Sequence, residues 1–244
     1  MRRLALLIAA TLLVAPAAEA RVRRPAQRLP VVVELFTAQG CSDCPKANDL
    51  LGKLAEEKGV VALTYSVDYW DYLGWKDNFA KPEFTERQRA YEAELKLRDV
   101  YTPQIVLDGA SQIAGAKPDA VQAAVADARR DRPYQPEIAV RSDGRLQLGS
   151  GEAPHGGAVV WLVRYDPGVR EVKVKTGENK GLTVRQTNEV RDLVKLGVWR
   201  GQPKLFRLPE ASEPGLDGVV LVQAAHGGRI LAARKLPTAP RERS

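Results

Sequence analysis

The sequence predicts an α/β domain followed by a mostly antiparallel β domain. Residues 31–128 alternate short apolar runs with helical patterns, whereas residues 137–236 consist of short β-rich runs separated by turn residues. The only two cysteines, Cys41 and Cys44, lie as C-x-x-C between an apolar run and a helical pattern. That context makes the pair a candidate redox site.

Residues 1–20 have the features of a secretory signal peptide. A basic start at residues 2–3 precedes an apolar run over 4–14 that is too short to span a bilayer, and residues 18–20 place small side chains at the cleavage positions. An uncleaved membrane anchor is the alternative. We expect an exported protein, periplasmic or secreted, with no stable membrane insertion after cleavage.

Composition is that of an ordinary globular protein. Hydrophobic residues make up 44% of the chain and charged residues 27%, and the formal net charge is +7. Lys and Arg are interleaved with Asp and Glu, so there is no basic stripe and we expect no nucleic-acid partner. After signal cleavage, the length fits one large or two small domains.

The first predicted elements form a β-α-β unit. After a flexible lead-in at 21–30, the apolar run Val31–Phe36 is typical of a strand buried on both faces. Apolar positions at helical spacing follow from Cys44, and Gly59 ends that helix. A second strand, Val60–Val67, follows a crossover and should therefore run parallel to the first. The C-x-x-C and the segment after Val67 then meet at one edge of the sheet.

That segment, 68–75, is rich in aromatic residues. Tyr69, Trp70 and Trp75 carry apolar rings with a polar atom, which suits a substrate-binding surface. The alternative is a loop that packs over the sheet edge. A helix is predicted next over Glu83–Arg98.

The last part of the first domain is a proline-led hairpin and a helix. Pro103 precedes a β-rich run. Proline cannot donate to a ladder, so it belongs at the start of a strand or at an edge. Asp108-Gly109 is a hairpin signal, 111–114 is the partner strand, and 120–128 has helical spacing. The element order is β-α-β-α-β-β-α.

This order, with C-x-x-C at the start of the first helix and Thr102-Pro103 before the next-to-last strand, resembles the thioredoxin fold. The runs V-E-L-F-T-A-Q-G-C-S-D-C-P, Y-S-V-D-Y-W-D-Y-L-G-W-K-D and Y-T-P-Q are similar to an exported thioredoxin-like family, domain of unknown function 1223. Segments 178–181 and 187–191 also match that family's pattern, without a chemistry that we can assign. The resemblance implies a thioredoxin-like domain over 31–130.

The resemblance also implies roles for the cysteines: Cys41 is the exposed attacking residue and Cys44 the buried resolving one. A helix N-terminus lowers a thiol pKa, whereas the acidic Asp43 opposes this, so we expect a middling to reducing potential. A purely structural bridge is a poor explanation, because so short a loop contributes only about 2 kcal/mol.

Two further site residues follow from the resemblance. Glu34 is a candidate catalytic residue that relays a proton behind the cysteines; a solvent-facing strand glutamate is the alternative. Thr102-Pro103 is expected to be a cis peptide that faces the disulfide and presents backbone to an extended substrate; a trans proline that merely starts a strand is the alternative.

Metal binding is the main chemical rival. Two thiolates make half a zinc or copper site, and the only histidines, His155 and His226, lie in Gly-rich turns far downstream. We therefore expect no metal site and no cofactor, although a copper carrier remains an alternative function.

The second domain follows a linker at 131–136 and is predicted as a β-sandwich of immunoglobulin-like type over 137–236, with a disordered tail at 237–244. Segment 182–198 fits a helix or a strand, and its neighbours favour a strand. The predicted strands are 137–141, 145–148, 158–164, 171–175, 204–208, 219–225 and 229–236.

We therefore predict an exported thiol–disulfide oxidoreductase whose partners are protein thiols or disulfides and a redox partner protein. The rival from a different class is a secreted thioredoxin-fold binding module without turnover, in which segment 68–75 and the second domain carry the function.

Overall fold

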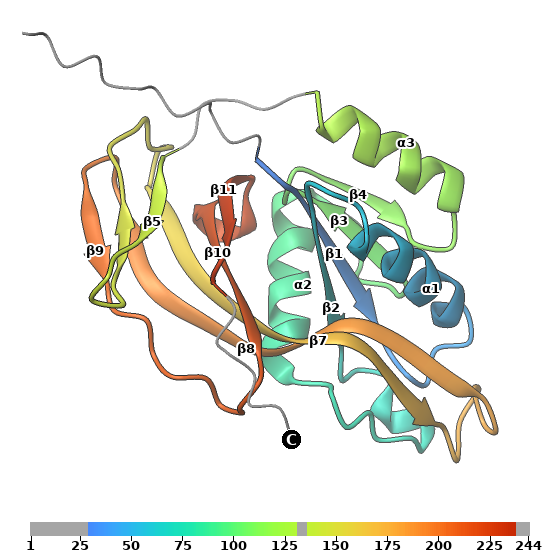
Figure 1. Ribbon diagram of the computed structural model, residues 1–244. Helices are drawn as coiled ribbons and strands as arrows, with labels where there is room; N and C mark the ends of the chain where they lie inside the picture. The colour runs from blue at the N-terminus through green and yellow to red at the C-terminus, as the bar shows by residue number, and fades with distance from the viewer. Residues whose placement is uncertain (1–28, 131–135, 238–244) are drawn as a thin grey trace, which may run out of the picture.

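The computed structural model describes residues 29–130 and 136–237, and they form a mixed α/β structure with two sheets (Figure 1). The predicted signal peptide, and most of the lead-in, linker and tail, lie outside these residues. The elements are β1 (Val31–Thr37), α1 (Cys44–Ala55), β2 (Val60–Ser66), η1 (Asp71–Leu73), α2 (Pro82–Glu94), β3 (Gln104–Leu107), β4 (Ser111–Ala114), α3 (Pro118–Ala128), β5 (Ile138–Val140), β6 (Leu146–Leu148), β7 (Ala158–Lys173), β8 (Thr183–Trp199), β9 (Lys204–Phe206), β10 (Asp217–Ala224), η2 (Ala225–Gly227) and β11 (Ile230–Lys235).

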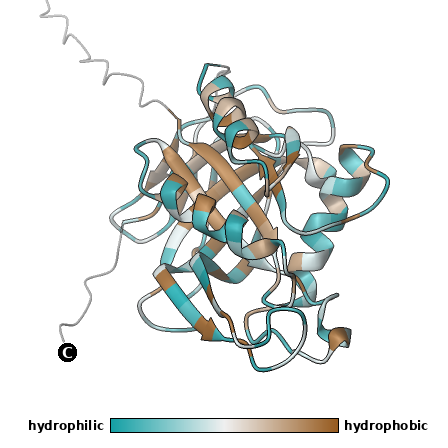
Figure 2. Cartoon of the chain, turned by 90° about the vertical axis from the view of Figure 1, so that its right-hand side faces the viewer, coloured by the Kyte–Doolittle hydropathy of each residue, from teal (hydrophilic) through white to brown (hydrophobic). Residues whose placement is uncertain are grey.

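The larger sheet has eight strands in the order β11-β10-β7-β8-β2-β1-β3-β4. As predicted, β1 and β2 are parallel, while β3 pairs antiparallel with both β1 and β4. Side-chain alternation along β1 divides its residues between two cores. Val31, Val33 and Leu35 pack with α1 and α3, whereas Val32 and Phe36 pack with α2. Figures 1 and 2 show this arrangement, with the apolar strands lying between the helices.

The sequence prediction is wrong about β7. It divides this segment into strands at 158–164 and 171–175, but β7 is one strand of 16 residues, with bulges that bend it between Arg164 and Val169. The predicted break at the Asp166-Pro167-Gly168 turn signal is absorbed as a bulge. Segment 182–198 is a strand, β8, as expected. The β7–β8 hairpin is therefore about 50 Å long.

The other predicted strands after residue 136 are observed with shifted ends. β5, β6 and β9 form a three-stranded antiparallel sheet. Its apolar face packs on the near half of the long hairpin and on β10, around the fully buried Trp199. The neighbouring strands β7 and β10 are buried on both faces. One face packs on β5-β6-β9, and the other face contacts α2. The β7–β8 hairpin thus connects the region that packs on β5-β6-β9 with strands β2 and β1, which precede and support the cysteine loop.

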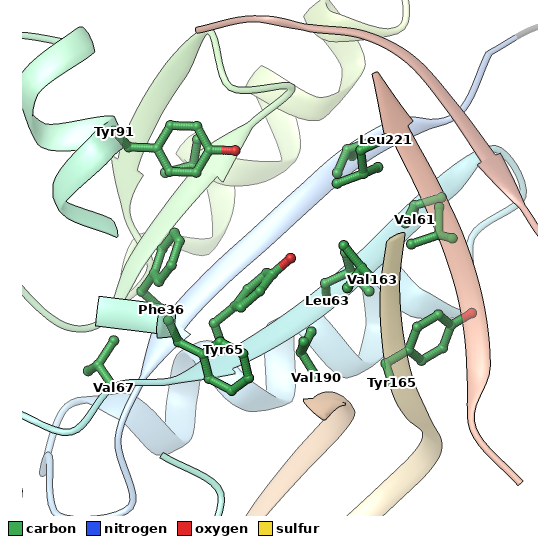
Figure 3. Close-up of a cluster of buried hydrophobic side chains, with 14 of the residues drawn as sticks. Phe36, Val61, Leu63, Tyr65, Val67, Tyr91, Val163, Tyr165, Val190 and Leu221 are labelled. Carbon is green, nitrogen blue, oxygen red and sulfur yellow. The ribbon is translucent and has the colours of Figure 1, made fainter. Parts of the chain in front are cut away.

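A buried ion pair lies on the α2 side of β1. The Glu34 carboxylate is fully buried and accepts two hydrogen bonds from the Arg87 guanidinium, at 2.8 and 3.2 Å. The Tyr91 hydroxyl donates to the same carboxylate, and the guanidinium lies over the rings of Tyr65, Tyr91 and Trp161. Figure 3 shows Tyr65 and Tyr91 among the buried hydrophobic side chains that surround this pair. The solvent-facing alternative for Glu34 is excluded.

Removal of the guanidinium tests how far the core depends on this pair. Arg87→Met leaves the Glu34 carboxylate buried without a cation, and we expect it to lower the free energy of unfolding by about 3–5 kcal/mol, measured in urea. The double variant Glu34→Leu/Arg87→Met should recover part of that loss. Arg145→Met, which breaks the exposed pair with Asp143, is the control and should change the free energy of unfolding far less, because solvent screens that pair. If Arg87→Met and Arg145→Met lowered the free energy of unfolding equally, the core would not depend on the buried pair of Glu34 and Arg87.

Two buried acids lie where β2 meets β8. The strands meet at one parallel bridge, Thr64 to Glu189. Glu189 is fully buried, and neither carboxyl oxygen makes a well-formed hydrogen bond within the described chain, although Ser66 is close. Burial, reinforced by the Asp77 carboxylate, raises the pKa of Glu189 well above its usual value. Burial also raises the pKa of Asp77 to about 6. Burial therefore favours the neutral form of Glu189.

This predicts a pH dependence of stability. Above the ordinary glutamate pKa of about 4.5, the folded state keeps a proton that the unfolded state releases, so the free energy of unfolding falls as pH rises. Glu189→Gln removes that contribution. Its stability relative to the native protein should increase from pH 5 to 8 by up to about 1.4 kcal/mol per pH unit. Urea unfolding at several pH values measures this, with the exposed Glu152→Gln as control; parallel curves for all three proteins would contradict it.

Candidate functional site: a covered disulfide at the start of α1

The cysteine pair lies between the end of β1 and the first turn of α1. Cys41 and Cys44 form a disulfide with a Cα–Cα distance of 5.4 Å. The Cys41 N–H bonds the Ala38 carbonyl and the Cys44 N–H bonds the Cys41 carbonyl, which closes two consecutive turns. Pro45 occupies the first helical turn, where its missing N–H removes no helix bond. The predicted strand, turn and helix around the motif are confirmed.

The expectation that Cys41 is exposed is wrong. Cys41 is only 2% exposed, and Cys44 is fully buried as expected. Tyr69 and Trp70 pack against the core cluster that contains both cysteines, and the Trp70 Cβ lies 3.9 Å from the position of a Cβ on Gly40. The disulfide is therefore covered in this structure.

Gln39 connects the cysteine loop to three other segments. This residue is fully buried, and its backbone N–H donates to the Asp77 carboxylate at 2.9 Å. Its side-chain amide donates to Asn78 and to Gln186 of β8, and it accepts from the Trp75 indole N–H at 3.0 Å. Since a buried polar network is costly to leave unsatisfied, these bonds hold the loop before Cys41 in one position.

The tip of the β7–β8 hairpin, residues 174–182, reaches the same loop. The Asn179 side-chain amide donates to the carbonyls of Gln39 and Cys41, both at 2.8 Å. The Glu178 carboxylate accepts the Ser42 N–H at 3.2 Å. The Thr176 hydroxyl donates to the Gly74 carbonyl in the aromatic segment. Figure 1 shows the far end of the hairpin beside the end of β1 and the start of α1.

Three aromatic residues of segment 68–75, Tyr69, Trp70 and Trp75, are half-buried and have different partners, whereas Tyr72 is 82% exposed. Trp75 bonds Gln39, whereas the Trp70 indole nitrogen and the Tyr69 hydroxyl are buried without a hydrogen bond in the described chain. Burial raises the pKa of Tyr69 to about 12, and its hydroxyl lies near Gln88 and Thr102. The structure thus places Tyr69 and Trp70 against the cysteine cluster and Trp75 in the network that holds it.

Thr102-Pro103 is a cis peptide, as predicted. The Pro103 carbonyl accepts the Gly115 N–H at 2.9 Å, and the β3 ladder begins at Gln104. A Cβ on Gly115 would lie 3.2 Å from the Pro103 Cβ and 3.0 Å from the Cβ of Ala47, which is one turn after Cys44. The absent side chain at Gly115 therefore lets Pro103 pack close to the first turn of α1.

Glu34 lies on the α2 face of β1, and the core cluster on that face also includes Cys41 and Cys44. The hydrogen bonds that the described residues make to its carboxylate come from Arg87 and Tyr91 of α2, on the face of the sheet opposite α1. A proton-relay role for Glu34 stays a prediction.

Sequence reasoning missed Gln39, Glu178 and Asn179 as parts of the site. Segment 178–181 carried a signal as a family pattern, but its chemistry depends on contacts across about 140 residues. Among the described residues, no group of three or more His, Cys, Asp or Glu side chains is placed to hold a metal ion, and none of the described helices is both long and apolar enough to cross a bilayer.

Comparisons with known proteins agree with this architecture. An X-ray crystal structure of a protein from Agrobacterium tumefaciens, a structural genomics target, superposes with a TM-score of 0.72 at 32% sequence identity, and the match covers 90% of this chain and 99% of that one. No curated protein matches this chain. A family model described as "Protein of unknown function (DUF1223)" matches residues 32–223, which include the cysteine pair, the cis proline and the hairpin tip. The chain therefore belongs to the DUF1223 family.

Proposed function

We propose that this protein is an exported thiol–disulfide oxidoreductase that exchanges disulfides with protein substrates and with a redox partner protein. The observation that carries the proposal is the geometry at α1. A four-residue disulfide loop leads into the helix, and Pro103 lies near Ala47 of α1, since both lie within 3.2 Å of the position of a Cβ on Gly115. The helix N-terminus favours a thiolate at Cys41, and Cys44 is close enough to resolve a mixed disulfide.

The arrangement of elements supports a thioredoxin-like domain over 31–130. The strand order β2-β1-β3-β4, with one parallel and two antiparallel pairs and helices on both faces, matches what that fold requires. The layers formed by β5-β6-β9 and by β7, β8, β10 and β11 support a sandwich-like second unit over 137–236. This second unit shares its larger sheet with the first, so the two act as one body through the long hairpin.

The proposed exchange has two steps. A substrate thiolate attacks the Cys41 sulfur; the Cys41–Cys44 bond breaks, a mixed disulfide forms, and Cys44 leaves as a thiolate. A second substrate thiolate then attacks the substrate sulfur of that mixed disulfide and releases Cys41, so that the substrate is oxidised by two electrons and the cysteine pair is reduced. The reverse sequence reduces a substrate disulfide. The backbone of Thr102, which precedes the β3 ladder, is proposed to pair with an extended substrate segment beside Cys41.

The rival functions use the same residues. A binding module without turnover would use Tyr69, Trp70 and Trp75 as a contact surface while the disulfide stays closed. A copper carrier would need further ligands beside the two sulfurs, and the described residues around them supply backbone groups and aromatic rings instead. We therefore favour disulfide exchange.

The first test traps the mixed disulfide. Cys44→Ser removes the resolving thiol, so a substrate that reacts with Cys41 should stay attached and appear as a higher band on a non-reducing gel of exported proteins. Cys41→Ser is the matched control and should trap no partner. Absence of trapped partners, together with a Cys41 thiol that fails to react with an alkylating agent, would favour the binding module.

The second test concerns the position of Pro103. Gly115→Ala introduces a Cβ at 3.0–3.2 Å from Ala47 and Pro103, so it should displace segment 102–103 from α1. We expect exchange with a protein thiol to slow by about tenfold, with little change for dithiothreitol, because only the larger substrate uses the backbone. Gly149→Ala, whose Cβ would meet its nearest neighbours at 3.5 Å, is the control. Equal slowing with both thiols would count against a substrate contact.

A further inference from the structure

The tip of the β7–β8 hairpin connects the two sides of the covered disulfide. On one side, Glu178 and Asn179 bond the backbone of the cysteine loop. On the other, Thr176 bonds Gly74, and a Cβ on Gly177 would lie 3.6 Å from the Trp75 Cβ. Trp75 in turn bonds Gln39 of the cysteine loop, so the tip, the aromatic segment and the cysteine loop form a closed ring of contacts.

These contacts are polar and few, whereas the base of the hairpin is firmly packed. In the tip, Val174 and Asn179 are buried and the other side chains of 175–182 are exposed, including Leu182 at 52%. By contrast, β7 and β8 contribute many residues to two apolar cores. A segment held by a few hydrogen bonds on a rigid support opens at a low free-energy cost. The tip is therefore the part of the cover that can separate without unfolding the sheet.

We propose that the hairpin tip is a latch over the Cys41–Cys44 disulfide, with Asn179 as its main fastening and Glu178 as a charge that tunes the Cys41 thiol. This rests on the proposed function and deepens it. Cys41 is 2% exposed, and Tyr69 and Trp70 pack against its cluster. The tip bonds both the cysteine loop and the aromatic segment, so its release would let these two segments separate and open a path to the Cys41 sulfur. Attack then breaks the Cys41–Cys44 bond, joins the incoming sulfur to Cys41 and leaves Cys44 as a thiolate.

Glu178 has a second effect, through charge. Its carboxylate occupies the Ser42 N–H beside the first turn of α1, where a Cys41 thiolate would otherwise be stabilised. A negative charge at this position disfavours a second one, so a closed latch favours the thiol over the thiolate at Cys41. Opening would thus expose the Cys41 sulfur to attack in the oxidised protein, and in the reduced protein it would increase the thiolate fraction of Cys41. Glu178 and Asn179 are positioning residues in this account, because they act through the cysteine loop.

Asn179→Ala tests the fastening. The variant loses both hydrogen bonds to the Gln39 and Cys41 carbonyls, and we expect the rate constant for reduction of the disulfide by dithiothreitol to rise about tenfold. The neighbouring Lys180→Ala is the matched control, because Lys180 is exposed and its backbone N–H, which the substitution keeps, donates to the Gly177 carbonyl. Hydrogen exchange followed by mass spectrometry should quicken in peptide 39–44 and remain unchanged in β1. A native reduction rate in Asn179→Ala would overturn the latch.

Glu178→Gln tests the charge while it keeps an oxygen that can accept the Ser42 N–H. In the reduced protein, a pH titration of thiolate absorbance should show a lower pKa for the Cys41 thiol, with about threefold more thiolate at a fixed pH below that pKa. A merely structural contact would leave this titration unchanged. Asp43→Asn removes an exposed acid within the motif that does not contact the hairpin tip. Its effect on the pKa of the Cys41 thiol shows how much a nearby charge contributes without the latch. No shift in Glu178→Gln would overturn the charge effect.

The two proposals fail in different ways. If the proposed function is wrong, Cys44→Ser traps no substrate although Asn179→Ala still speeds reduction by dithiothreitol. If the latch is wrong, Cys44→Ser traps substrates and Asn179→Ala and Lys180→Ala react at the native rate.

Discussion

The hydrogen bonds of Gln39 are the interaction on which the rest of the site depends. This one buried side chain and its backbone link the cysteine loop to Trp75, Asp77 and Gln186. A buried amide that loses its partners costs more free energy than its bonds contribute when made, so the segments are coupled. The loop before Cys41, the aromatic segment and β8 consequently hold their positions together. The hairpin tip adds to a network that already exists.

The β7–β8 hairpin connects the coupled segments physically, because β8 carries Gln186 and the hairpin tip carries Asn179 to the cysteine loop. The β7–β8 hairpin extends from the layer that packs on β5-β6-β9, past β2, to a tip beside the start of α1. The second half of the chain is therefore a support that carries Glu178 and Asn179 to the cysteines. The same crossing buries Glu189 and Asp77 at the junction of β2 and β8, and burial there favours their neutral forms.

Much of the fold could be predicted, because its signals are local. The period-two and helical patterns, the Asp108-Gly109 turn and Pro103 mark elements that the structure confirms to within a few residues. The division of β7 failed because Pro167-Gly168 is a turn signal that the sheet accommodates as a bulge. Glu34 was singled out by its place in the strand, but strand alternation directs it to α2, where Arg87 neutralises it.

By itself, the sequence determined the chemistry that is available: two cysteines at the start of a helix, an acid between them, and a proline before a strand. The tertiary structure decided their accessibility. Cys41 is covered because Tyr69 and Trp70 pack against its cluster, and its loop is held in place by a hydrogen bond from Asn179, 138 positions away in the sequence. No local pattern contains such a contact, because the distance it spans along the chain is closed only when the sheet assembles.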